Sequence, residues 1–235
     1  MKIYLDRRLG DVHDLISFSE TLVCVQEYYP DAVDYRPEAR LPVDFRKLDQ
    51  FEVNKYTACL DELSIEDELD FVAIFPCDLQ SERALDFSPF LSLSPVAALD
   101  PSIDHGDRPS ITVDRVSGLR LGLHLDSWDG LEVSSRWKSR NRIVVNRGPA
   151  DRYVYLVPVP IEEMAESVAS PDRLHPGEVA DAYIRKTKQA PCLRMLQPAN
   201  VAYVCCTERL VHDACVRAGG IRAESRHYLG HFVRN

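Results

Sequence analysis

The chain has 235 residues, of which 45% are hydrophobic and 28% charged, with a formal net charge of −9. This length is enough for a buried core, and the composition is neither disordered nor low in complexity. The negative charge argues against a general nucleic-acid binder, and the longest apolar runs are far too short to span a membrane.

The first half of the chain is predicted to be mostly helical, with loops. Apolar residues recur at nearly helical spacing from 11 to about 27, and again from 45 to about 63. Residues 71–76 form a short apolar run that is typical of a buried strand. Residues 84–110 are rich in Pro, Ser and Asp, and we expect them to form an ordered loop.

The second half consists of short runs rich in Val, Ile, Leu and Tyr, with glycines between them. Strands are predicted over 111–116, 119–125, 142–146, 153–159, 202–207 and 226–233, and helices over 161–168 and 177–188. Such a pattern favours a mainly β fold with flanking helices. We expect a single domain over 1–235, with a mostly helical flanking region over 1–110 and a β core over 111–235.

One motif in this half suggests a metal site. The sequence Leu119-Arg-Leu-Gly-Leu-His124-Leu-Asp126 places a histidine and a carboxylate two residues apart in a predicted strand, so both project from one face. They would be two of the three ligands of the facial triad that holds non-haem Fe(II). Chance alone gives about one His-x-Asp or His-x-Glu in such a chain. A second instance, His105-Gly-Asp107, lies among turn-forming residues, which favours the strand pair.

The third ligand should be a histidine far downstream on a neighbouring strand. His212 lies 88 residues after His124 and follows a β-like run. His175 competes, but the prolines around it indicate a helix cap or a loop. His227 and His231 leave no room for an anion-binding strand after them.

Two arginines, Arg222 and Arg226, follow His212 by ten and fourteen residues. The order of His-x-Asp, distant His and Arg resembles the Fe(II)/2-oxoglutarate-dependent oxygenases, over residues 111–235. The longer gap is similar to the clavaminate synthase and taurine dioxygenase branch, and the shorter gap to the phytanoyl-hydroxylase type. The resemblance implies a double-stranded β-helix core, that is, a cupin-like jelly roll, with helices around it.

The resemblance also implies roles for individual residues. His124, Asp126 and His212 would bind Fe(II). Arg226, or else Arg222, would pair with the distal carboxylate of 2-oxoglutarate, with Asn146 in place of the Thr or Ser that often assists. The implied enzyme is a cytosolic biosynthetic dioxygenase that uses O₂ to hydroxylate or desaturate an unactivated C–H bond. Its substrate would be a small molecule such as an amino acid or a natural-product intermediate. Because Asp126 is the carboxylate that related halogenases replace, halogenation is not expected.

The segment 127–140 links two predicted strands at the mouth of this site. Trp128 and basic residues such as Arg140 are candidates for binding a polar or anionic substrate. An exposed loop with an anchoring tryptophan explains the same sequence equally well. The start of the chain lacks the apolar run of a signal peptide, which is the basis for expecting a cytosolic protein.

Other functions stay open at this point. A cupin-like metal-dependent enzyme or isomerase would bind a metal without 2-oxoglutarate and would give no role to Arg222 or Arg226. A non-catalytic β-core binding protein would use its acidic first half against a basic partner. The seven cysteines are expected to be reduced and mostly buried, although a Cys–His nucleophile using Cys205, Cys206 or Cys215 is a further alternative. The first half could also cover the site as a lid or form a homodimer surface.

The charge is unevenly distributed between the two halves. Residues 1–117 contain 11 Lys and Arg against 24 Asp and Glu, a net charge of −13, whereas residues 118–235 have a net charge of +4. A basic core suits a site that must attract a dianionic co-substrate. The acidic first half has no such explanation.

Overall fold

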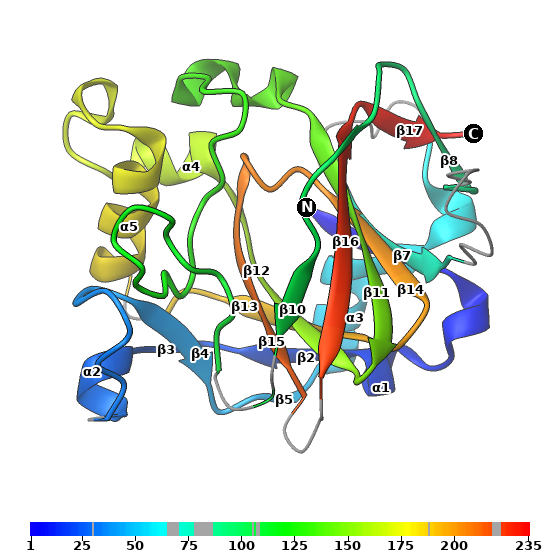
Figure 1. Ribbon diagram of the computed structural model, residues 1–235, viewed down its shortest axis with the longest axis horizontal. Coiled ribbons are helices and arrows are strands. Elements are labelled where there is room, and N and C mark those ends of the chain that lie inside the picture. The colour runs from blue at the N-terminus through cyan, green and yellow to red at the C-terminus, as the bar shows by residue number, and fades with distance from the viewer. Residues whose placement is uncertain are drawn as a thin grey trace.

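The computed structural model describes residues 1–29, 31–64, 71–77, 87–104, 106, 109–187, 189–217 and 222–235. In this part of the chain two β-sheets lie face to face, and short helices surround them (Figure 1). The helices α4 (Ile161–Glu166) and α5 (Pro176–Lys186) lie together on one side. Among the described helices, none is long and apolar enough to cross a membrane.

The larger sheet has eight described strands, most of them antiparallel. Its order is β10 (Ser102–Asp104), β16 (Ala223–Gly230), β11 (Asn141–Pro149), β14 (Val201–Cys205), β7 (Phe71–Pro76), β1 (Lys2–Leu5) and β6 (Thr57–Cys59), and β9 (Ala97–Ala98) also pairs with β16. Strand β1 runs parallel to both of its neighbours. The first residues of the chain therefore form an inner strand of this sheet.

The smaller sheet is antiparallel throughout. Its order is β15 (Leu210–Val216), β12 (Arg152–Pro160), β13 (Cys192–Gln197), β2 (Ile16–Ser19) and β5 (Arg46–Lys47). At its open edge, His124 forms an isolated bridge with His212 of β15.

Shorter elements complete the fold. Two strand pairs lie outside the sheets, β3 (Thr21–Cys24) with β4 (Arg40–Val43) and β8 (Phe90–Ser92) with β17 (Phe232–Arg234). The remaining helices are α1 (Val12–Leu15), α2 (Val25–Tyr28), α3 (Gln50–Tyr56) and the 3₁₀ turns η1 (Arg7–Leu9), η2 (Leu60–Glu62), η4 (Val133–Lys138) and η5 (Pro171–Arg173).

The path of the chain between the two sheets defines a jelly roll. From β10 it crosses to the His124 bridge in the smaller sheet, returns to β11, and crosses again to β12 and β13. It then passes through β14, β15 and β16 in alternating sheets. This alternation is the pattern of a double-stranded β-helix. The predicted fold class, mainly β with flanking helices around such a core, is confirmed.

Alternating side chains of both sheets form the core between them. Val144 and Tyr203 of the larger sheet meet Val154 and Leu156 of the smaller sheet, and all four are buried. On the outer face of the smaller sheet, the apolar faces of α4 and α5 pack against β12 and β15. The space between the sheets is therefore closed by apolar packing along much of its length.

The prediction that residues 1–110 are mostly helical is wrong. The described residues there contain strands β1 to β10, and their longest helix is α3, which begins at a capping box formed by Asp49 and Glu52. Residues 16–19, expected within a helix, form β2 and pair with β13. In the run Leu15-Ile-Ser-Phe18 the apolar residues fit a period of two as well as a helical period, and pairing with β13 selects the strand.

In the second half, β11, β12, β14 and β16 confirm predicted strands, and α4 and α5 confirm both helices up to Lys186. Residues 111–125 are different, because they form only isolated bridges instead of the two predicted strands. Gly118 and Gly122 have φ angles of 71° and 67° and turn the chain within this segment. The sequence pattern did not reveal β13 and β15, and the supposed loop over 84–110 contains β8, β9 and β10.

Candidate metal centre

Backbone hydrogen bonds bring His124, Asp126 and His212 together. The amide of His124 donates to the carbonyl of His212 at 3.0 Å, and the amide of His212 donates back at 2.9 Å. Two residues on, the amide of Asp126 donates to the carbonyl of Thr207 at 3.0 Å. The two segments that carry these three side chains are thus fixed against each other.

The side-chain atoms of the three residues converge on one point. Asp126 Oδ1 lies 3.7 Å from His124 Nε2, and Asp126 Oδ2 lies 3.6 Å from His212 Nε2. One ligand atom from each residue lies within 4.8 Å of the others, and both histidines are buried. Two imidazoles and one carboxylate are the donor set of the facial triad.

Hydrogen bonds on the far side of each ring fix its orientation. His124 Nδ1 donates to the carbonyl of Gly122 at 2.8 Å, and His212 Nδ1 donates to the carbonyl of Leu210 at 3.0 Å. In the neutral form of each ring the proton therefore sits on Nδ1, and the Nε2 lone pair faces Asp126. Metal-binding histidines are commonly oriented in this way. Gly122 cannot be replaced without strain, because a Cβ would lie 2.7 Å from the carbonyl oxygen of Arg40.

The charges in the site favour an ionised carboxylate at Asp126 and a neutral imidazole at His212. Burial lowers the pKa of His212 to about 3, with the charges of His124 and Arg142 adding to the effect. Burial alone would raise the pKa of Asp126, but Arg142 and the two histidines hold it well below its usual range. For His124, Asp126 outweighs the effect of burial and raises the pKa.

One atom of the cluster is left without a hydrogen bond. Asp126 Oδ2 is buried and accepts none from the described residues, although Arg142 lies close to it. A buried carboxylate oxygen without a hydrogen bond is unfavourable unless a cation satisfies it, and here the guanidinium of Arg142 is that cation. Two imidazoles and one carboxylate are nevertheless a donor set that fits a divalent metal ion.

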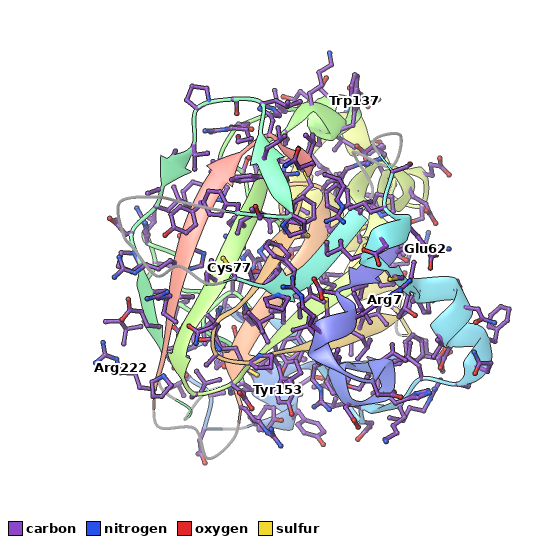
Figure 2. The ribbon with its side chains drawn as sticks, turned by 90° about the vertical axis from the view of Figure 1, so that its right-hand side faces the viewer. Arg7, Glu62, Cys77, Trp137, Tyr153 and Arg222 are labelled. Atoms are coloured by element: carbon purple, nitrogen blue, oxygen red, sulfur yellow. The ribbon has the colours of Figure 1, made fainter. Side chains whose placement is uncertain are left out.

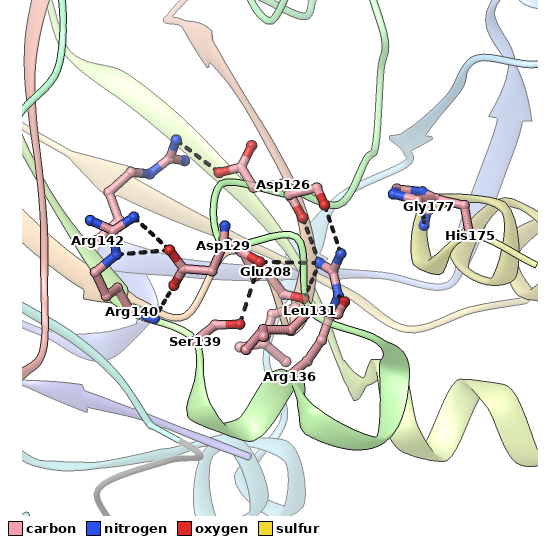
Figure 3. Close-up of polar contacts among 12 residues, drawn as sticks. Asp126, Asp129, Leu131, Arg136, Ser139, Arg140, Arg142, His175, Gly177 and Glu208 are labelled. Atoms are coloured by element: carbon pink, nitrogen blue, oxygen red, sulfur yellow. Dashed lines mark hydrogen bonds and ion pairs between the residues drawn. The ribbon is translucent and has the colours of Figure 1, made fainter. Parts of the chain in front are cut away.

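Arg142 lies directly against the cluster. Its Nη1 is 3.0 Å from Asp126 Oδ2, and its Nη2 is 3.1 Å from His212 Nε2 (Figure 3 shows the ion pair with Asp126). In the sequence it belongs to a basic run that reads as exposed. The only feature of the sequence that suggested an inward-facing Arg142 was its position at the start of the strand predicted over 142–146.

The cluster opens onto a cavity of about 240 Å³ between the sheets. Beyond the three candidate ligands, its wall includes Arg142, Arg152 of β12, Tyr203 of β14 and His227 of β16. Arg152 is almost completely buried, and its Nη1 donates to Gln197 Oε1 at 3.1 Å. Its Nε donates to no group in the described part of the chain.

Ser102 and His227, which lie in the cavity wall, form a second polar group together with Ser225. Ser225 Oγ lies 2.6 Å from Ser102 Oγ and 3.1 Å from His227 Nε2. Burial, together with the charges of Arg142 and Arg152, holds the pKa of His227 well below its usual range. His227 is therefore a neutral side chain, which can act as donor or acceptor beside two arginines.

The structure does not bring the predicted co-substrate residues to this cavity. Arg226 lies on the opposite face of β16 from Ser225 and His227, and its Nε donates to Glu224 at 2.9 Å. Arg222 is exposed, and Figure 2 shows it at the rim of the molecule. Asn146 is buried but not in the cavity wall. Its amide bonds to three backbone groups around the end of β11.

Of the two predicted substrate residues, the structure places one in the cavity wall and the other outside it. Trp128 lies in the cavity wall and is partly exposed, as a residue at the mouth would be. Arg140 points elsewhere and forms an ion pair with Asp129 (Figure 3). Of the other histidines, His175 caps α5, as expected, and His105 lies outside the described residues.

A fully buried arginine anchors the loop that follows Asp126. Arg136 of η4 donates to the carbonyls of Asp126 and Glu208 at 2.6 and 2.7 Å (Figure 3). It also donates to the carbonyl of Leu131 and to Ser127 Oγ, both at 3.0 Å. One side chain thereby ties the Asp126 segment to the segment that precedes His212.

The cysteines do not form a nucleophilic site. All seven, each in the described part of the chain, are free thiols, and six are buried, as expected. Burial raises the pKa of Cys206 to about 12 and that of Cys215 to about 11, and it also raises the pKa of Cys205. Thiols with such values stay protonated near neutral pH and are poor nucleophiles.

Comparisons with known proteins add little to this geometry. No protein-family model and no curated protein matches the chain. Among solved structures it is similar to the Kdo hydroxylase KdoO, a non-heme Fe(II) alphaketoglutarate dependent dioxygenase. The complex with succinate and Fe(III) matches with a TM-score of 0.41 and 12% identity, over 79% of this chain and 85% of that one. The cobalt(II) complex matches with a TM-score of 0.36 and 15% identity, over 59% and 54%.

In the cobalt(II) comparison the match thus covers about half the length of that chain. At these identities and TM-scores the likeness carries no argument about the activity of this chain. The site itself has to carry it.

Proposed function

We propose that the chain is an Fe(II)/2-oxoglutarate-dependent oxygenase that hydroxylates or desaturates a C–H bond of a small molecule. The observation that carries this proposal is the buried cluster of His124, Asp126 and His212 at the edge of a cavity that holds Arg152. A facial triad leaves coordination positions open for a co-substrate and O₂. A buried arginine supplies a partner for a carboxylate.

The chain's own residues would bind and orient the reactants. His124, Asp126 and His212 would hold the iron, and the hydrogen bonds at each Nδ1 would keep both Nε2 atoms directed at it. Iron and 2-oxoglutarate, when bound, supply the oxidising chemistry. The closed apolar packing between the sheets would exclude water, and Trp128 at the mouth would contact the substrate.

Arg152, rather than Arg226 or Arg222, would hold the distal carboxylate of 2-oxoglutarate. Three of the described arginines lie in the cavity wall: Arg142 is against the candidate metal ligands and Arg115 is largely exposed, whereas Arg152 is buried and its Nε is available for an acceptor. Hydrogen bonds to charged groups contribute about 1.5–3 kcal/mol. We expect Arg152→Gln to weaken 2-oxoglutarate binding roughly 10- to 100-fold, as measured by titration of the Fe(II)-loaded protein.

Arg226→Gln is the matched control, because it removes the same group from the outer face of β16. Its 2-oxoglutarate affinity should equal that of the wild type, and circular dichroism should show both variants folded. Weaker binding in Arg226→Gln with unchanged binding in Arg152→Gln would reverse the assignment.

One experiment tests the oxygenase class itself. Anaerobic addition of Fe(II) and 2-oxoglutarate should produce a weak metal-to-ligand charge-transfer band in the visible spectrum. His124→Ala should lose the band, because one ligand is missing. A folded, iron-loaded wild type that shows no such band would contradict the oxygenase proposal. A band that persists in His124→Ala would show that the iron binds at another site.

The second candidate is a cupin-like metal enzyme that does not use 2-oxoglutarate. The specific observation in its favour is that Arg226 and Arg222 both lie outside the cavity wall. It predicts metal binding that depends on His212 but no spectral change with 2-oxoglutarate. A protein that binds no metal at all would instead fit a non-catalytic β-core binding protein.

A further inference from the structure

Arg142 uses the same atoms that a metal ion would need. Its Nη2 donates to the Nε2 lone pair of His212 at 3.1 Å, and its Nη1 pairs with Asp126 Oδ2 at 3.0 Å. A lone pair that accepts a hydrogen bond cannot bind a metal at the same time. A guanidinium is charged at all ordinary pH values, so it would also repel a divalent cation.

Because the backbone of Arg142 is held inside a sheet, only its side chain can move away from Asp126 and His212. Arg142 pairs with Cys205 of β14 on one side and with Leu229 of β16 on the other, inside the larger sheet. A buried arginine that leaves its carboxylate needs another partner, because an unpaired buried charge is costly. The adjoining cavity, whose wall already includes Arg142, is where an anionic ligand would provide one.

We propose that Arg142 is a built-in competitor of the metal for Asp126 and His212, and that an anionic ligand in the cavity draws it away. This inference rests on the proposed function for the nature of the metal site. It makes metal binding and carboxylate binding mutually supportive. By the reciprocity of linked equilibria, each ligand then increases the affinity for the other by the same factor.

The competition can be measured without enzyme activity. The probe is Co(II), titrated calorimetrically into the wild type, Arg142→Gln and the control Arg226→Gln. If the wild-type arginine occupies the ligands nine-tenths of the time, Arg142→Gln should bind Co(II) about tenfold more tightly. The control should match the wild type.

The release by an anion is tested with succinate, which lacks the 2-oxo group and so cannot chelate as an oxo acid does. Succinate should tighten Co(II) binding to the wild type about 5- to 100-fold, within the usual range of coupling between sites. In Arg142→Gln this enhancement should disappear. The wild-type measurement stands even if Arg142→Gln fails to fold, and Arg142→Lys, with a single shorter contact, should fall between the two.

The outcomes separate the inference from the proposed function. Equal Co(II) affinity in the wild type and Arg142→Gln, or no effect of succinate on the wild type, would overturn the role of Arg142 while leaving the oxygenase proposal intact. Co(II) binding to Arg142→Gln alone would support competition and would overturn the oxygenase proposal, because Arg142 would then be the permanent cation. Binding to neither protein would overturn both.

Discussion

Replacement of Asp126 with alanine is expected to abolish metal binding and to lower the free energy of unfolding by about 3–5 kcal/mol. Removal of one partner of a buried ion pair costs about this much, because the other charge is left uncompensated. Here the group left without its partner is Arg142, whose side chain is as buried as the carboxylate. The measurements are a Co(II) titration and urea unfolding in the presence of a chelator.

Asp151→Ala is the matched control, since the Asp151–Arg217 pair is largely exposed and exposed pairs contribute about 0–1 kcal/mol. The difference should also depend on pH. The pKa of Asp126 is well below its usual range in the folded chain, so its stabilising effect is present above about pH 4 and is lost as pH falls through the folded pKa. A variant as stable as wild type at pH 7 would contradict the charge balance described for the site.

The second large effect is expected for Arg136→Met. The side chain is completely buried, and its loss leaves three carbonyls without this donor. It also removes the cation 3.7 Å from the buried carboxylate of Glu208, which keeps its hydrogen bonds from Asp129 and Ser139. We expect the free energy of unfolding to fall by about 3–5 kcal/mol. The same side chain fixes the Asp126 segment, so Co(II) affinity should also fall roughly 10- to 100-fold. Losses of this size are usual when a residue that holds a metal ligand in place is removed.

Arg140→Met is the matched control, because Arg140 belongs to the same segment of the chain. Its ion pair with Asp129 is partly exposed. It should cost about 1 kcal/mol or less. Adding Glu208→Gln to Arg136→Met should recover part of the loss, which a double-mutant cycle would report as coupling. Additive losses in that cycle would show that Arg136 acts through its carbonyl contacts and not through Glu208.

The parts of the site that could be predicted are those that depend on local geometry. The spacing of His124 and Asp126, and the position of His212 after a β-like run, were enough to select three residues that the fold brings together. The arginines could not be chosen in this way. A strand changes face with every residue, so the family's spacing pointed to Arg226, while its neighbour His227 is the residue of β16 that lies in the cavity wall.

Long-range pairing explains most of the other differences. Arg142 and Arg152 look in the sequence like the many exposed arginines of the chain, and only the facing sheet shows that both are interior. Likewise, Ile16 and Phe18 fit a helical period until β13 provides an edge for them. The mainly β class needed only the number and composition of short strands, and the jelly-roll core was implied by the resemblance to the oxygenases. Neither prediction depended on the exact bounds of individual elements.

The single bridge between His124 and His212 has a kinetic consequence. Strand β15 is held to β12 along most of its length, whereas the segment with two of the three candidate ligands is joined to β15 by one bridge. The bond from Asp126 to Thr207 and the side chain of Arg136 join this segment only to the turn before β15. Local opening is easiest where the fewest backbone bonds must break. The residence time of a metal here would thus be set by the fraying of this edge, and the rest of the barrel could remain folded while the ion leaves.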